Sequence, residues 1–216
     1  MRANPHSIHV RSRGTSPDRR RGFSLVEVLV SIVVLSFGLL GMVGLQAFAL
    51  QSNREAKQQG QAAVLARELA EMMRGNKVVS TDPDAADNPY LGTFAVGALT
   101  MGANAAYCSG AGTSTPCTTP LAVARAEMTD WLTRVDTELP GARVSICFDA
   151  APYDSDGMPQ WTCNATGANE IVVIKIGWTR TSTDRRETGA AAFERASDKP
   201  PNVIFPVTGG NATSGT

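Results

Sequence analysis

The residues of this 216-residue chain whose types and spacing could do chemistry are one isolated carboxylate and four thiols. Glu27 is the single charge in the apolar run from Phe23 to Leu45. The thiols belong to Cys108, Cys117, Cys147 and Cys163. A carboxylate in an apolar run calls for a cationic partner, and an even number of cysteines favours disulfides or a metal site.

Histidine chemistry is confined to the start of the chain, because His6 and His9 both precede Phe23. The segment before Phe23 has six arginines and one aspartate, a net charge of +5, so the remainder of the neutral chain is at −5. If the segment before Phe23 is removed, the remaining chain has no histidine. Ser-His and Cys-His nucleophile pairs and His-ligated metal sites are then excluded. Overall neutrality also argues against a dedicated nucleic-acid binder. We predict a protein that is not an enzyme, has no cofactor or metal, and binds no nucleic acid.

The apolar run predicts a helix that crosses a membrane. As a helix it is about 35 Å long, enough for a hydrocarbon core of about 30 Å. Arg19, Arg20 and Arg21 stand immediately before it, and such a cluster holds the N-terminal side in the cytoplasm. No second long apolar run follows, so the sequence predicts a single crossing.

Three interpretations of this segment compete. A cleaved secretory signal would have a shorter apolar core and a small-residue cleavage site, whereas this run is long and is followed by Gln46-Ala47-Phe48. A plain membrane anchor does not explain Glu27, because a carboxylate at mid-depth costs about 2.5–3.5 kcal/mol. The third interpretation explains the carboxylate by a partner on another molecule.

That interpretation comes from a family resemblance. Arg21-Gly22-Phe23-Ser24-Leu25-Val26-Glu27 resembles the class III signal of type IV prepilins and type II secretion pseudopilins. In that signal a basic leader ends in Gly, and a Phe begins a hydrophobic helix with Glu at its fifth position. The continuation VLVSIVVLSFGLLGMVGLQ and a later ARELAEMMRGN are more similar to minor pilins of the PilV type. The resemblance covers about residues 19–76, and a leader that runs from Met1 to Gly22 is longer than is usual in the family.

The resemblance implies roles for three matched residues. A membrane aspartyl peptidase, the prepilin peptidase, would cut between Gly22 and Phe23 and methylate the new amine of Phe23. Gly22 suits an extended peptide in a protease cleft because it has no side chain. Glu27 would attract the N-terminal ammonium of a neighbouring subunit, and in a low-dielectric bundle that attraction gains strength.

The resemblance also implies location, partners and function. The chain would be stored in the inner membrane, with a cytoplasmic N-terminus and a periplasmic head, and would then enter an extracellular pilus. Its partners would be other major and minor pilins, the prepilin peptidase and the inner-membrane assembly platform. The expected function is that of a minor pilin that helps to start assembly. Two alternatives are a type II secretion pseudopilin and, more distantly, a membrane-anchored periplasmic binding or catalytic domain.

The expected fold is α+β and type IV pilin-like, with a long N-terminal helix packed on a small antiparallel sheet. We divide the chain into a leader (1–22), a long helix (23–75, with 23–45 in the membrane or filament core) and a head (76–216). The second half of the helix shows apolar residues at helical spacing, which predicts a stripe that packs on the head. These residues are Ala62, Leu65, Ala66, Leu69, Met72 and Met73. Gly75-Asn76 predicts the end of the helix.

The head has a second predicted helix and several predicted strands. Thr119-Pro120 reads as an N-cap followed by proline at the first helical position, and predicts a helix near 120–139 that ends at Pro140-Gly141. Strands are predicted near 143–149, 160–164 and 170–179, with an edge piece at 202–207. Apolar and polar residues alternate in the longer strands, which predicts an antiparallel meander with one buried face. Residues 76–119 read as a long loop region with short extended pieces.

The cysteines lie on the predicted outer side of the membrane, where disulfides form. Three connectivities are possible, and we favour Cys108–Cys117 with Cys147–Cys163 because each closes a local loop. A four-thiolate zinc site would need closely spaced cysteine pairs, which are absent. Asp154-Ser155-Asp156-Gly157 is a fragment of a calcium loop without its distal Glu, and predicts a turn.

Overall fold

The computed structural model describes residues 22–108, 117–165, 170–182, 184 and 186–207. The predicted leader up to Arg21, with its arginine cluster, therefore lies outside the described residues. The chain divides into two compact units, residues 1–49 and 50–216. Helix α1, Leu25–Gly75, begins in the first unit and ends in the second, at the predicted stop.

The first unit consists, in its described part, of the N-terminal portion of α1. Every described residue from 22 to 50 is exposed, including the large apolar side chains. An α-helix that is apolar all round and exposed along its length is suited to lipid or to other helices rather than to water.

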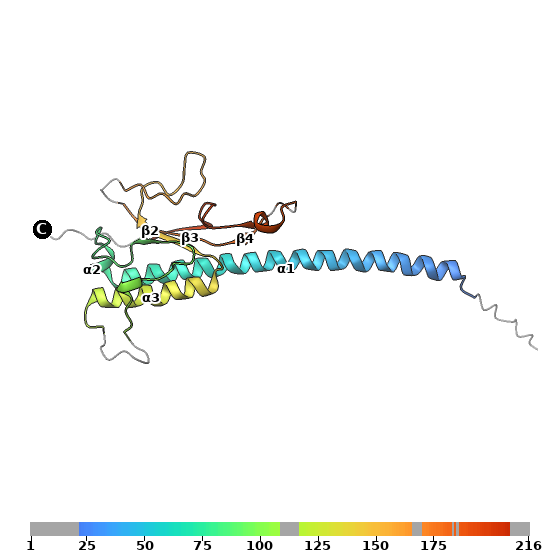
Figure 1. Ribbon diagram of the computed structural model, residues 1–216, viewed down its shortest axis with the longest axis horizontal. Coiled ribbons are helices and arrows are strands. Elements are labelled where there is room, and N and C mark those ends of the chain that lie inside the picture. The colour runs from blue at the N-terminus through green and yellow to red at the C-terminus, as the bar shows by residue number, and fades with distance from the viewer. Residues whose placement is uncertain (1–21, 109–116, 166–169, 183, 185, 208–216) are drawn as a thin grey trace, which may run out of the picture. The chain divides into compact units, whose positions relative to one another are not determined.

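The second unit confirms the predicted α+β class. Its main sheet is antiparallel, with strands in the order β1-β2-β3-β6, and helices α1 and α3 lie together against it (Figure 1). The bounds of these strands are Gly92–Phe94 for β1, Arg143–Phe148 for β2, Val172–Gly177 for β3 and Val203–Val207 for β6. Helix α3 spans Pro120–Glu138.

The core lies between the two helices and one face of the sheet. Helix α1 buries one side of its last turns, and α3 buries the side that faces it. The α1 side consists of Ala62, Leu65, Ala66, Leu69, Ala70 and Met73, and the main α3 residues are Ala124, Met128, Trp131, Leu132 and Val135. The predicted stripe is thus correct except at Met72, which is half-buried and packs at the edge of the core, while Ala70 takes a buried place.

Two polar contacts fix the register of the helices. The Trp131 indole Nε1 donates to the Leu65 carbonyl oxygen at 2.9 Å. The Arg134 guanidinium binds the Glu68 carboxylate with two bonds, of 2.7 and 2.6 Å. Because a bidentate Arg–carboxylate pair allows little sliding, it adds orientation to the apolar packing.

The ends of α3 follow their local chemistry. Thr119 has extended backbone, and its Oγ1 accepts a hydrogen bond from the Ala122 amide at 3.1 Å, with Pro120 at the first helical position. Gly141, after the helix, has φ +58°, and a Cβ there would lie 2.5 Å from Thr179 Oγ1. Glycine therefore allows the turn into β2.

The described part of the region predicted as a long loop, residues 76–108 and 117–119, is more ordered than expected. It contains the short helix α2 (Lys77–Ser80), the edge strand β1 and the 3-10 turn η1 (Gly102–Asn104). The fully buried Asn88 side chain donates to the carbonyls of Ser80 and Asp82 at 3.2 and 2.8 Å and accepts from the Tyr90 amide at 3.1 Å. One side chain thus replaces the backbone pairing that a regular element would provide.

The strands predicted near 143–149 and 170–179 are β2 and β3, and the edge piece at 202–207 is β6. The strand predicted at 160–164 is wrong. The carbonyl oxygens of Gln160 and Thr162 accept hydrogen bonds from the Lys175 ammonium, at 2.8 and 2.7 Å, instead of pairing in a ladder. Strand β6 takes the place beside β3.

The prediction of one buried sheet face is also wrong, because every residue of β3 is buried. The segment 150–164 covers the outer face, where the Trp161 ring lies 4.3 Å from the Arg143 guanidinium and its Nε1 donates to the Lys199 carbonyl at 2.8 Å. A Cβ at Gly177 would lie 2.8 Å from the Trp161 ring, so the glycine makes room for it.

Beneath this cover lies a buried ion pair. Lys175 Nζ is 2.5 Å from Asp149 Oδ2, and neither side chain is exposed. Asp149 Oδ1 also accepts from the amides of Ala151 and Asn164, at 2.9 and 3.1 Å. Burial acts to raise the pKa of Asp149, but the Lys175 ammonium and the two amides outweigh it, so that the pKa lies below its usual 3.8. The outer layer is therefore held by charge as well as by apolar contact.

Replacing Lys175 should destabilise the head, because the Asp149 carboxylate would stay buried without a cation. We expect Lys175→Ala to lower the free energy of unfolding of the head by about 3–5 kcal/mol. The paired replacement Lys175→Met with Asp149→Asn should recover part of this loss, because no charge then stays buried and the Asn oxygen can still accept from the amides of Ala151 and Asn164. Urea unfolding of detergent-solubilised protein, followed by tryptophan fluorescence, measures both, and a single variant as stable as the wild type would contradict the role of the pair.

The same pair predicts sensitivity to acid. Since the pKa of Asp149 is lowered in the folded state, its contribution is present above the usual value of 3.8 and is lost as the pH falls through the lower, folded value. Unfolding curves between about pH 5 and about pH 2 should show a smaller loss of stability for the Lys175→Met, Asp149→Asn protein than for the wild type. Parallel losses would assign acid sensitivity to other carboxylates.

Candidate processing and assembly site

The predicted cleavage site lies just before the first turn of α1. Gly22, Phe23 and Ser24 are not helical, and the helix begins at Leu25. All three are exposed, with the Phe23 side chain at 82%. A protease binds an extended segment and not a closed helical turn, so the bond between Gly22 and Phe23 is in a form that a peptidase can engage.

Glu27 lies in the first turn of α1, where the helix dipole favours a negative charge. Its side chain is exposed, and among the described residues no cation or hydrogen-bond donor contacts it. Within the described part of the chain its charge is therefore not balanced by an ion pair.

The serines of the same segment are satisfied within the helix. Ser31 Oγ donates to the Glu27 carbonyl and Ser36 Oγ to the Ile32 carbonyl, each at 2.7 Å. A hydroxyl bonded to the carbonyl four residues earlier loses most of its polarity toward lipid. The sequence analysis did not predict these hydrogen bonds, although a serine inside a predicted helix commonly donates to the carbonyl four residues earlier.

Helix α1 is long and apolar enough to cross a membrane. Its most apolar 18-residue window has a mean hydropathy of 2.6, and none of that window is buried within the protein. A core helix of a soluble domain would bury such a window. The segment thus meets the physical requirements of the predicted anchor.

The structure joins Cys108 to Cys117 and Cys147 to Cys163, which is the pairing that the sequence favoured. In the part of the chain that the structure describes, Cys147, Asp149 and Cys163 have ligand atoms close enough to hold a metal. The two sulfurs are bonded to each other and the carboxylate pairs with Lys175, so these groups are already occupied.

The calcium-like fragment forms a turn. Asp154 Oδ1 accepts from the amides of Asp156 and Met158, at 3.0 and 2.8 Å, and Gly157 has φ +76°. These bonds use the carboxylate to close a loop, as Asp does in Asx turns.

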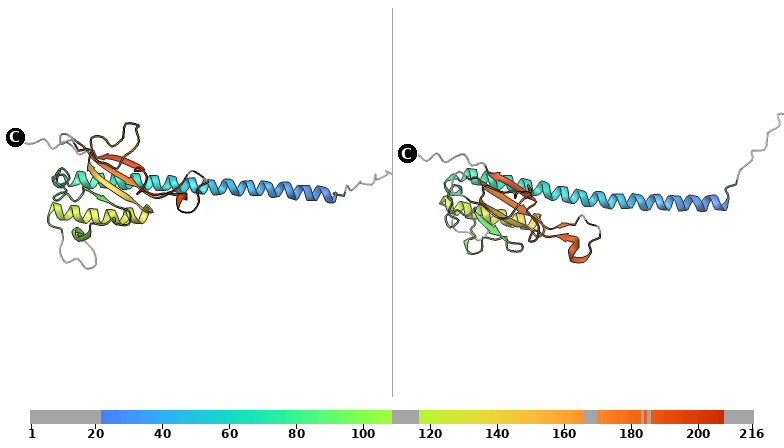
Figure 2. Two further views of the ribbon diagram at one scale, coloured as in Figure 1. Left: turned by 45° about the horizontal axis from the view of Figure 1, so that its top comes forward. Right: turned by 90° about the horizontal axis from the view of Figure 1, so that it is seen from above.

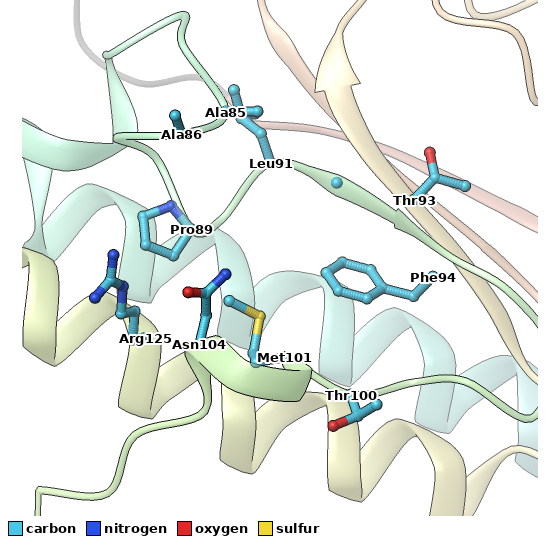
Figure 3. Close-up of a pocket in the computed structure, with 11 residues that line it drawn as sticks. Ala85, Ala86, Pro89, Leu91, Thr93, Phe94, Thr100, Met101, Asn104 and Arg125 are labelled. Carbon is cyan, nitrogen blue, oxygen red and sulfur yellow. The ribbon is translucent and has the colours of Figure 1, made fainter.

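A pocket of about 200 Å³ that the sequence did not predict lies beside β1 (Figure 3). The side chains of Pro89, Phe94, Met101 and Arg125 point toward it from four different segments. Arg125 is the one charged side chain among the described lining residues, which include no carboxylate, histidine or cysteine. The lining thus offers no general acid–base pair.

Comparison with known families gives a match at the N-terminal end of the chain. A family model for the prokaryotic N-terminal methylation motif matches residues 17–43. The chain carries a prepilin-type signal. This places its N-terminal segment with those of type IV pilins and pseudopilins, which are structural subunits, and it fits an inner-membrane anchor that later enters a filament. No curated protein and no solved structure is a significant match to the chain.

Cleavage by the peptidase should depend on the absence of a side chain at Gly22. We expect Gly22→Leu to leave the leader attached, because a branched side chain would obstruct the extended peptide in the peptidase. N-terminal sequencing and intact mass of the membrane-extracted protein report cleavage and methylation together. Ser24→Ala, on the other side of the bond, should be processed normally, and a Gly22→Leu product that still begins at Phe23 would refute the assignment.

Proposed function

We propose that this protein is a minor pilin of a type IV pilus. In this proposal it is cut between Gly22 and Phe23, methylated at Phe23, and incorporated into the filament through α1. The observation that carries the proposal is Glu27, a carboxylate in the first helical turn of an apolar segment, within a matched N-terminal methylation motif and without a cation among its described neighbours.

The physical argument begins with the cost of that carboxylate. In lipid an unpaired Glu27 is penalised, whereas the ammonium at the N-terminus of an adjacent subunit would neutralise it. Cleavage creates this ammonium on Phe23, four residues from Glu27 in the sequence. Processing therefore supplies the cation that registration of one subunit on the next requires.

The minor-pilin role is supported by similarity to the PilV type over residues 19–76. By that similarity the protein helps to start assembly. Its partners are other major and minor pilins, the prepilin peptidase and the inner-membrane assembly platform. Before assembly it is held in the inner membrane by a single crossing, with the N-terminus in the cytoplasm and the head in the periplasm.

The test is removal of the carboxylate without removal of the cleavage site. We expect Glu27→Gln and Glu27→Ala to be cleaved and methylated but to be depleted from sheared pili by about tenfold or more, as the loss of one buried ion pair implies. Immunoblots of the membrane and pilus fractions measure this.

Ser36→Ala is a matched control, because it changes a polar residue of the same helix without changing charge. It should enter pili like the wild type. Normal incorporation of both Glu27 variants would refute the assembly role of the carboxylate.

Gene deletion separates the two filament systems. Loss of pili and of twitching motility supports the minor-pilin role, whereas loss of exoprotein secretion would favour a type II secretion pseudopilin. A head that functions without membrane or partners would favour an anchored periplasmic domain.

A further inference from the structure

Between β3 and β6 the chain makes an excursion that carries a second, two-stranded sheet. Strand β4, Arg180–Thr181, pairs with β5, Phe193–Glu194, and the 3-10 turn η2, Gly189–Ala192, leads directly into β5. This pair stands away from the four-stranded sheet (Figure 2). The excursion adds little to the core, since of its β4, η2 and β5 residues none belongs to the buried cluster.

Among the described residues, one ion pair connects the excursion to α1, and two others join residues within it. Arg180 Nη1 is 3.5 Å from Glu55 Oε1, and Arg180 Nε donates to Glu194 Oε2 at 2.6 Å. Lys199 Nζ lies 3.9 Å from the other oxygen of Glu194. Arg180 therefore connects β4 and β5 to one position of the long helix, Glu55.

Glu55 lies shortly after the last exposed apolar residue of α1, because Phe48 and Leu50 continue the apolar surface beyond the predicted span, which ends at Leu45. Leu50 is exposed and is followed by Gln51, Ser52, Asn53 and Arg54, which are polar. From Leu50 to Glu55 an α-helix rises by about 7.5 Å. If α1 is in a membrane up to Leu50, Arg180 lies at about the depth of the lipid headgroups.

The residues that lead into β5 are apolar and exposed. Ala190 and Ala191 are exposed in η2, and the Phe193 side chain is 52% exposed. The charges around them balance, since the sequence from Asp184 to Arg195 has three arginines and three carboxylates. These are Arg185, Arg186 and Arg195, and Asp184, Glu187 and Glu194. An aromatic side chain among small apolar residues, with mixed charges around it, suits the boundary between headgroups and acyl chains.

We propose that the Gly189–Phe193 segment contacts the surface of the membrane that holds α1 before assembly. Phe193 enters the headgroup region, and Arg180 sets the distance of the segment from the helix. The contact would keep the head at a fixed height above the bilayer. This inference rests on the proposed function, because it requires α1 to be in a membrane. As the flanking charges balance, the contact should depend little on salt or on anionic lipid.

The experiment uses the processed, full-length chain in phosphatidylethanolamine–phosphatidylglycerol vesicles whose acyl chains are brominated near the headgroups. Tryptophan emission of Phe193→Trp is compared with the wild type to isolate the new indole. Val78→Trp is the matched control, because Val78 is 80% exposed but lies on α2, after the far end of α1. We expect about twofold quenching of the new indole at position 193 and little at position 78, because only an indole near the acyl chains meets bromine.

Arg180→Ala tests the connection to the helix. Adding it to Phe193→Trp should reduce the quenching, and the effect of salt should stay small throughout. Equal quenching of Phe193→Trp and Val78→Trp, or none in either, would overturn the proposal. The proposal would also be overturned if the indole at position 193 were quenched in no membrane sample and became buried only in assembled filaments. That result would indicate a contact with another subunit.

Flotation of the same vesicles separates this inference from the proposed function. Protein that floats with the vesicles but shows no quenching at position 193 refutes the surface contact alone. Protein that does not float refutes the membrane anchor.

Discussion

The structure depends on a single constraint, that one helix must meet two different surroundings. From Leu25 to Leu50 the side chains of α1 are exposed on all sides and largely apolar. From Ala62 to Met73 the apolar residues narrow to one side, and α3 and the sheet bury that side. The first pattern requires lipid or other helices, whereas the second requires a folded head. Such a helix is suited to a subunit that is first anchored and then assembled.

The parts of the fold that could be predicted are those whose signals are local. The end of α1 at Gly75, the start of α3 at Thr119-Pro120 and the strands β2 and β3 follow from caps and periodicity. The cover of the outer sheet face could not be predicted in this way. Lys175 has the alternation of a solvent-facing residue, and its partners, Asp149, Gln160 and Thr162, lie outside its strand, in the segment that follows β2. A lysine among β-branched residues of a strand was the available signal.

In the candidate site too, local features could be predicted from the sequence, whereas contacts between distant residues could not. Gly22, Phe23 and Glu27 could be named because they match a family motif that is continuous in the sequence, and the structure adds that the proposed cleavage site is not helical. The Arg180–Glu55 pair joins the long helix α1 to strand β4, far along the chain, and no pattern in the sequence indicates it. Strand β1 has three residues, too few for alternation to be recognised. Long-range polar contacts thus account for most of what the sequence leaves open.

The Ser31 and Ser36 hydroxyls, which bond back to carbonyls of their own helix, have a consequence for the rotation of the helix in the bilayer. Because the Ser31 and Ser36 hydroxyls need no partner from their surroundings, α1 can rotate about its axis in lipid without breaking a hydrogen bond. In the proposed assembly, Glu27 is then the group of this segment that sets the rotation of the helix about its axis. In this proposed assembly, a subunit approaches the filament in any rotation about the helix axis and is aligned when Glu27 meets the N-terminal amine of the neighbouring subunit.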